Sequence, residues 1–128
     1  MTQKKLKLSV LEDLFTIHRF PTNYDIPEQI YESKFYSISK TEDELSIVCN
    51  SSILLNSEET ETGWSCIKVL GPLDFSLTGI LADISAVLAK AEISIFALST
   101  FDTDYILVKS EQISFAKDAL LVSGYTFK

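Results

Sequence analysis

The feature that most constrains the fold is a pair of helical stripes in the second half of the chain. The first stripe has apolar residues at the spacing i, i+3, i+4, i+7, and they are Leu77, Ile80, Leu81, Ile84, Leu88 and Ala91. The second stripe, in 111-EQISFAKDALLVSG-124, consists of Ile113, Ala116 and Leu120. This spacing is typical of helices with one buried face. Ser76 or Thr78 is the predicted N-cap of the first helix, and Gly124 suits the position just beyond the end of the second.

Segments typical of strands surround both stripes. They are 64-WSCIKVLG-71, which alternates and breaks at Gly-Pro, then 93-ISIFALS-99, 104-DYILVKS-110 and 125-YTFK-128. Their β-branched and aromatic content favours strands. The resulting order is β-α-β-β-α-β. It predicts an α+β protein with two helices on one face of an antiparallel sheet, which is the ferredoxin-like fold.

The first half of the chain has a related but shorter plan. The segment 6-LKLSVL-11 predicts a strand, and 34-KFYSISKT-41 with 44-ELSIVCNS-51 predicts a hairpin. The segment 11-LEDLFTIHRF-20 suits a strand or a short helix. Residues 22–33 are too few for a full crossover helix.

A polar segment, 56-NSEETETGW-64, predicts an exposed loop or linker between the two halves. We therefore predict two related units in tandem, with the boundary after residue 60. Residues 1–60 form the abbreviated unit, and residues 61–128 form the complete one.

The composition excludes several classes of function. The chain has 128 residues, a net charge of −7 and only 11 basic residues, which disfavours nucleic acid and anionic membranes as partners. No apolar run is long enough to span a bilayer, and the N-terminus lacks the features of a signal peptide. We expect a cytoplasmic protein. Cys49 and Cys66 lie in apolar runs, so reduced, packed thiols are favoured over a disulfide.

The sequence contains no recognisable catalytic, metal or cofactor motif. His18 is the only histidine, so it is the one base available to a Ser-His-Asp triad, and no G-x-S-x-G elbow accompanies it. We interpret it as a partly buried strand residue or a surface tip. Asp102 and Asp104 lack the further ligands of a calcium loop, and zinc and phosphate-loop motifs are absent. We therefore expect no enzyme activity, no metal and no cofactor.

The hairpin 98-LSTFDTDYILV-108 carries more polar chemistry than a turn requires. Ser99, Thr100 and Thr103 supply hydroxyls and Asp104 supplies a carboxylate, which can bind the ammonium of a free amino acid. The loop 75-FSLTG-79, at a helix N-terminus, suits the carboxylate of the same ligand, and Gly79 permits close backbone approach.

The alternative is a turn in which these side chains bond only their own backbone. The residues alone favour that alternative. Phe101 is either a pocket wall or a core anchor, and Asp102 is interpreted as a solvated turn residue.

Residues 63–125 resemble the ACT domains, which are small ferredoxin-like regulatory modules that bind amino acids. The shared marks are Thr78-Gly79-Ile80-Leu81, Ile93-Ser94-Ile95-Phe96 and the Ser-Thr-aromatic-x-Thr-Asp-Tyr element at 99–105. Residues 39–49 resemble the same group more weakly. The closest likeness is to compact bacterial proteins with two ACT units, related to units of cytosolic arginine sensors and aspartokinase. ACT units usually place glycine before the second strand, where this chain has Glu92; a left-handed Glu92 would cost roughly 1 kcal/mol.

The resemblance shifts the preference from a self-bonded turn to ligand binding. It implies a regulatory protein that binds a free amino acid, without catalysis of its own, and that pairs edge to edge as a homodimer. The alternative is a structural interaction module with a vestigial site. The implied ligand-binding residues are Phe75, Ser76, Leu77, Thr78, Gly79, Ile80, Ser99, Thr100, Phe101 and Asp104.

Overall fold

A computed structural model of the protein describes residues 6–57, 59–71 and 79–128 and divides the chain into two compact units. The N-terminal unit consists of residues 13–64. The C-terminal unit consists of residues 65–128 together with the chain up to residue 12. The division predicted after residue 60 falls close to the observed one at residue 64, but it assigns the first strand to the other unit.

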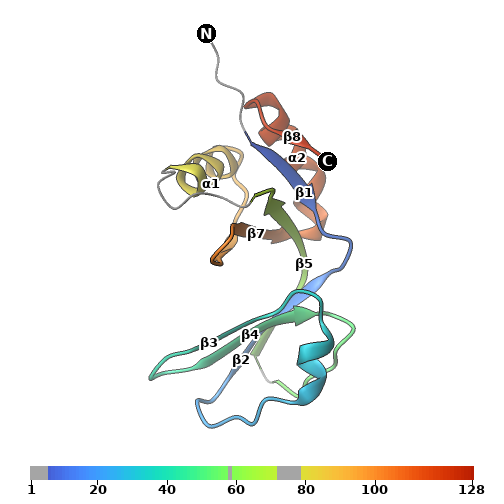
Figure 1. The fold of residues 1–128 in the computed structure, drawn as a ribbon, viewed down its shortest axis with the longest axis vertical. Coiled ribbons are helices and arrows are strands. Elements are labelled where there is room, and N and C mark those ends of the chain that lie inside the picture. The colour runs from blue at the N-terminus through green and yellow to red at the C-terminus, as the bar shows by residue number, and fades with distance from the viewer. Residues whose placement is uncertain (1–5, 58, 72–78) are drawn as a thin grey trace. The chain divides into compact units, whose positions relative to one another are not determined.

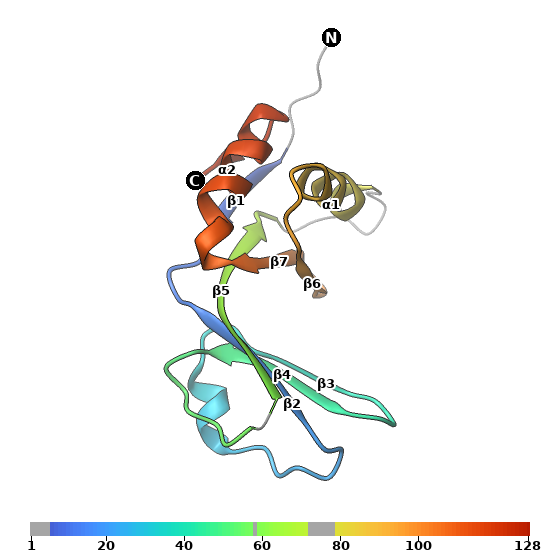
Figure 2. The same cartoon turned by 180° about the vertical axis from the view of Figure 1, so that it is seen from behind.

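The N-terminal unit is an antiparallel sheet covered by one short helix (Figure 1). Its strands are β2 (Phe15–Phe20), β3 (Ser37–Lys40), β4 (Leu45–Asn50) and the first part of β5 (Glu59–Val69), in the order β3-β4-β2-β5. The predicted hairpin is thus confirmed as β3-β4, and the segment 11–20 forms a strand. The 3-10 helix η1 (Glu28–Glu32), cyan in Figure 2, replaces a crossover helix. The core of this unit contains Phe20, Ile30, Leu45, Ile47 and Cys49.

Strand β5 begins earlier than the sequence predicts. The polar segment at 56–64 was expected to be a loop, but β5 starts at Glu59 and pairs with β2, with Glu61 opposite Ile17 and Glu59 opposite Arg19. The glutamates remain exposed, and the Arg19–Glu59 pair, 3.8 Å apart, is a surface ion pair that contributes little to stability. Pairing with β2 therefore outweighs the low strand propensity of glutamate.

The C-terminal unit has the predicted β-α-β-β-α-β order. Its elements after β5 are α1 (Ile80–Lys90), β6 (Phe96–Ser99), β7 (Asp104–Lys109), η2 (Ser110–Gln112), α2 (Ile113–Val122) and β8 (Thr126–Phe127). The α+β, ferredoxin-like prediction is confirmed. Both predicted helices and the strands between them lie where the periodicity placed them.

The sheet of this unit contains one strand that the β-α-β-β-α-β plan does not include. Strand β1 (Lys7–Val10) lies between β5 and β8, so the order is β6-β7-β5-β1-β8. Leu8 is opposite Val69 in an antiparallel pair with β5 and opposite Phe127 in a parallel pair with β8. Strand β1 is therefore an inner strand of this sheet, and β8 is an edge strand.

Both helices bury their predicted stripes in one core with the strands. The fully buried members of this core are Leu8, Ile67, Val69, Ile84, Leu88, Ile106, Val108, Ala116 and Leu120, with Ile93 and Tyr125 nearly so. Ile80, Leu81 and Ile113 pack at its margin, whereas Ala91 is exposed and Leu77 lies outside the described residues. No helix in the described part of the chain has the length and apolar character needed to cross a membrane.

The two helices end in the same way. Glu92 (φ 62°) and Gly124 (φ 104°) follow α1 and α2 in positive-φ conformations. After each, a backbone N–H returns to the last turn: Ile93 donates to Leu88 O at 2.9 Å, and Tyr125 to Leu120 O at 3.0 Å. This is the Schellman arrangement. The predicted position of Gly124 just beyond the second helix is confirmed, and Glu92 adopts the left-handed conformation that glycine usually takes at this place.

Candidate ligand-binding site

The polar hairpin is ordered by bonds among its own residues. Ser99 and Asp104 form the last pair between β6 and β7, and Ser99 Oγ donates to Asp104 Oδ1 at 2.6 Å. Thr100 N–H and Thr100 Oγ1 both donate to Thr103 O, at 2.8 and 3.1 Å. Ser99 and Thr100 are exposed and Asp104 is half-buried. A carboxylate oriented by a neighbouring hydroxyl thus lies at the accessible end of two strands.

Thr103 attaches the hairpin to the sheet. Its side chain is buried, and Oγ1 donates to Val69 O at 2.6 Å. Val69 is the last residue of β5, and the chain continues from there towards α1. The hairpin and the last residue of β5 therefore lie at the same end of the sheet. The sequence left open whether the hairpin and the segment that leads to α1 share an edge.

Gly79 stands at the start of α1. It is the N-cap residue, with φ 81° and no side-chain capping bond, and its carbonyl accepts the first helical hydrogen bond from Asp83 N–H at 2.9 Å. An L side chain rarely adopts this φ, which accounts for glycine. A Cβ added here would meet no atom of the described residues within 4 Å. Ser76 and Thr78, the predicted N-caps, lie outside the described residues.

The other predicted site residues have the following positions. Phe75, Ser76, Leu77 and Thr78 lie outside the described residues. Ile80 opens α1 and packs at the margin of the core. Phe101 is 80% exposed, so the interpretation as a core anchor was wrong, and its role as a pocket wall stays a prediction. Asp102 is an exposed turn residue, as predicted.

One histidine and two cysteines are buried away from the hairpin. His18 lies in β2, stacked on Phe20, and burial lowers its pKa below the usual 6.5. Cys49 and Cys66 are free, buried thiols, and burial raises the pKa of both, that of Cys66 to about 12. Within the described residues, no group of three His, Cys, Asp or Glu side chains is arranged to hold a metal ion.

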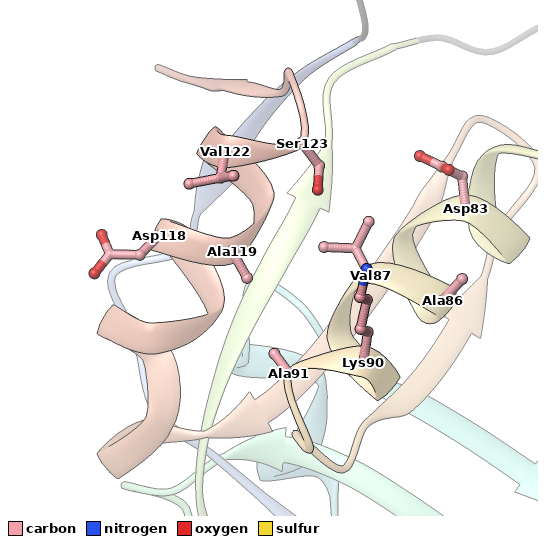
Figure 3. Close-up of a pocket in the computed structure, with 9 residues that line it drawn as sticks. All are labelled: Asp83, Ala86, Val87, Lys90, Ala91, Asp118, Ala119, Val122 and Ser123. Atoms are coloured by element: carbon pink, nitrogen blue, oxygen red, sulfur yellow. The ribbon is translucent and has the colours of Figure 1, made fainter.

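A groove of about 620 Å³ runs between the two helices (Figure 3). It contains none of the predicted site residues, and its lining residues are Asp83, Ala86, Val87, Lys90, Ala91, Asp118, Ala119, Val122 and Ser123. Asp83, one of these lining residues, accepts a hydrogen bond at Oδ2 from Tyr125 Oη. Burial, and then the Asp83 carboxylate, raise the pKa of Tyr125.

Sequence reasoning overlooked the Tyr125–Asp83 bond. Two features of the sequence point to these residues: Asp83 lies beside the apolar stripe of the first helix, and Tyr125 directly follows Gly124. Neither signal identifies the other residue as its partner.

Comparison with known proteins assigns both parts of the chain. The family model of the ACT domain matches residues 59–121, and a second model, of an N-terminal domain, matches residues 13–54. The rat cytosolic arginine sensor for mTORC1 subunit 1 (Rattus norvegicus) is 35% identical over 95 residues, covering 67% of this chain and 28% of the rat protein. The orangutan protein of the same name (Pongo abelii) is 32% identical over 125 residues, covering 88% and 37%. The chain thus spans well under half the length of these relatives.

Solved structures show the same fold. A crystal structure of an Agobacterium tumefaciens protein has a TM-score of 0.90 and 35% identity, covering 98% of this chain and 94% of that one. Aspartate kinase from Clostridium acetobutylicum has a TM-score of 0.69 at 13% identity, with 96% and 36% covered, which is evidence for the fold alone. The family model, the sensor relatives and the shared fold agree, and the chain belongs to the ACT domain family.

Proposed function

We propose that this protein is a regulatory module that binds a free amino acid and has no catalysis of its own. Membership of the ACT family and the sequence relatives named as arginine sensors support a regulatory, amino-acid-binding role. The observation that carries the proposal is the Asp104 carboxylate, oriented by Ser99 and held at the end of the sheet where β5 ends.

The two ends of an amino acid need opposite partners. Asp104 binds the ammonium through a charge-assisted hydrogen bond, roughly twice as strong as a neutral one. The start of helix α1 can bind the carboxylate of the ligand. The first helical hydrogen bond is donated by Asp83 N–H, so the N–H groups before it have no acceptor within the helix. The helix dipole also favours a carboxylate at this end. Gly79 and Ile80 thus bind one end of the ligand, and Ser99, Thr100 and Asp104 the other, with Phe101 as a wall. Phe75, Ser76, Leu77 and Thr78 belong to the same proposed site.

The ligand is a cationic amino acid, with arginine as the first candidate. The whole chain has a net charge of −7, which favours a cationic ligand over an anionic one. The names of the sequence relatives support the same choice. The protein acts in the cytoplasm, and as a homodimer joined edge to edge.

Calorimetric titration with each of the twenty amino acids tests the proposal. We expect heat with arginine, a dissociation constant at least tenfold weaker for Asp104→Ala because a charge-assisted bond is lost, and a change within about twofold for Asp102→Asn. Asp102 is the matched control, since it is an exposed carboxylate in the same hairpin. Absence of heat with all twenty amino acids would contradict the proposal. Equal losses of affinity in Asp104→Ala and Asp102→Asn would mean that Asp104 acts only through its charge and not through a direct hydrogen bond to the ligand.

One observation favours a second candidate, a structural interaction module. Ser99 and Asp104 bond each other, and Thr100 bonds Thr103, so the hairpin needs no ligand to satisfy these groups. If no amino acid binds and Asp104→Ala still retains a protein partner isolated with the wild type, this second candidate replaces the first.

A further inference from the structure

A partly buried hydrogen bond joins α1 of the C-terminal unit to the residue Tyr125, which follows the end of α2. Tyr125 is 4% exposed and belongs to the core that contains Leu88 and Leu120. Its hydroxyl donates to Asp83 Oδ2, in the first turns of α1. Figure 3 shows Asp83 on the α1 side of the groove and Ser123, at the end of α2, on the opposite side. The bond therefore joins the chain just beyond the end of α2 to the first turns of α1.

Asp83 bonds both Tyr125 and Gly79. Its backbone N–H donates to the Gly79 carbonyl at 2.9 Å, while its carboxylate accepts from Tyr125. The N-cap residue of α1 is Gly79, which has no side chain that could cap the helix. Helix starts usually depend on a capping side chain for their geometry. Among the described residues, the bond from Tyr125 is a side-chain restraint on the first turns of this helix.

Tyr125 is itself held firmly. Its N–H closes the Schellman arrangement by donating to Leu120 O at 3.0 Å, and its ring is packed in the core. Burial and the neighbouring carboxylate raise the pKa of its hydroxyl, so it remains a donor at neutral pH. A fixed donor at the end of α2 thus faces an acceptor on α1.

We infer that Asp83 and Tyr125 are positioning residues for the amino-acid site, holding Gly79 and Ile80 where the N–H groups at the start of α1 meet the ligand carboxylate. The inference rests on the proposed function. It adds two residues that lie outside the hairpin and bind no ligand themselves. The required chemistry is an acceptor oxygen at position 83 and a hydroxyl at position 125, whereas a charge at position 83 is not required.

Four variants of the full chain separate these requirements. Tyr125→Phe removes only the hydroxyl, Asp83→Ala removes the acceptor, and Asp83→Asn keeps an acceptor oxygen without the charge. Asp118→Asn is the control, because Asp118 is a second aspartate of the same groove and, in Figure 3, points away from Asp83. The dissociation constant for L-arginine and the amide hydrogen exchange of residues 80–83 are measured for each.

We expect Tyr125→Phe and Asp83→Ala each to weaken arginine binding about fivefold to tenfold, as for loss of one hydrogen bond to a charged group. The double variant should lose no more than either alone, since both remove the same bond. Asp83→Asn and Asp118→Asn should stay within about threefold of the wild type. The amide of Asp83 should exchange at least about fivefold faster in Tyr125→Phe.

The two readouts separate failure of this inference from failure of the proposed function. A wild type that binds no amino acid contradicts the proposed function, and amide exchange alone then decides the positioning role. Unchanged exchange in Tyr125→Phe overturns the inference whatever the ligand does. Wild-type affinity in Tyr125→Phe also overturns it. A loss in Asp83→Asn equal to that in Asp83→Ala, with Tyr125→Phe unaffected, would assign Asp83 a purely electrostatic role.

Discussion

At the scale of single residues, Thr103 makes the contact on which the hairpin depends most. Its buried hydroxyl donates to the carbonyl of Val69. Thr103→Val keeps the shape of the side chain but leaves that carbonyl without the hydroxyl. We expect a loss of about 1–3 kcal/mol in the free energy of unfolding, measured by urea denaturation. Thr103→Ser retains the hydroxyl and should lose less. A larger loss for serine than for valine would mean that the methyl group, and not the hydrogen bond, holds the hairpin.

His18 makes stability depend on pH. It is 4% exposed, and neither ring nitrogen has a hydrogen-bond partner among the described residues. Its neighbours across the sheet, Ile47 and Thr60, carry no charge. Burial disfavours the protonated ring, which lowers the pKa in the folded state below 6.5.

The sign of the effect follows from linkage. Well above pH 6.5, His18 is unprotonated in both the folded and the unfolded protein, so its protonation lowers the free energy of unfolding by nothing there. Below that pH the unfolded state binds the proton first, and stability falls as the pH drops towards the folded pKa. Between pH 7.5 and 5.5, the free energy of unfolding of the wild type should fall more than that of His18→Leu, by at most about 1.4 kcal/mol per pH unit. Parallel pH profiles for the two proteins would exclude this role for His18.

Residue types in the sequence predict the chemistry of the hairpin, but they do not predict which distant residues its side chains bond. Hydroxyls and a carboxylate beside two strands identify the candidate site, and the exposed position of Asp102 follows from turn chemistry alone. The bonds from Thr103 to Val69 and from Tyr125 to Asp83 join residues 34 and 42 positions apart. Local patterns contain no information on such pairs. The same limit applies to Phe101, whose exposure depends on the tertiary fold.

At the scale of elements, the two helix ends form a natural comparison. Glu92 and Gly124 occupy equivalent positive-φ positions, but only glycine adopts this conformation without a steric penalty. Glu92→Gly should therefore raise the free energy of unfolding by roughly 1 kcal/mol, partly reduced by the greater freedom of glycine in the unfolded chain. Thermal and urea denaturation measure the change.

Gly124→Ala is the matched reverse substitution and should destabilise by a similar or larger amount. Opposite signs at the two sites would establish the backbone conformation as the cause. Destabilisation by Glu92→Gly would contradict the prediction and assign the Glu92 side chain a contact of its own.

Element boundaries were predictable where apolar periodicity is strong. The stripes at Ile84–Leu88 and Ala116–Leu120 correctly located both helices. The start of β5 was not predictable, because Glu59 and Glu61 have the composition of a loop and become a strand only through pairing with β2. The N-cap position of Gly79 at the start of α1 was also not predicted.

At the scale of the whole molecule, strand β1 determines how the chain is divided. The apolar segment at 6–11 predicts a strand but not its neighbours, and two of its contacts are with residues at the opposite end of the sequence. In the C-terminal unit, β1 is an inner strand: Leu70 N–H donates to Lys7 O, and Lys128 N–H donates to Leu8 O. A sequence-based boundary after residue 60 separates this strand from the sheet that it completes.

Removing β1 should therefore unfold the C-terminal unit while leaving the N-terminal unit folded. A truncated chain beginning at Asp13 keeps every strand of the N-terminal unit, but it exposes the edges of both β5 and β8. The two thiols report the units separately, because Cys66 lies in the C-terminal unit beside β1, and Cys49 lies in the core of the N-terminal unit. In the full chain both thiols are buried and should resist a thiol reagent.

In the truncated chain, mass spectrometry should find Cys66 labelled at least about tenfold faster and Cys49 still protected, since labelling of a buried thiol follows the opening of its own unit. A chain beginning at Leu6, which retains β1, is the control and should match the full protein. Continued protection of Cys66 would mean that the C-terminal unit folds without its inserted strand, as a four-stranded ferredoxin-like sheet. Labelling of both thiols would mean that the N-terminal unit cannot fold without β1, and that the two units form one cooperative structure.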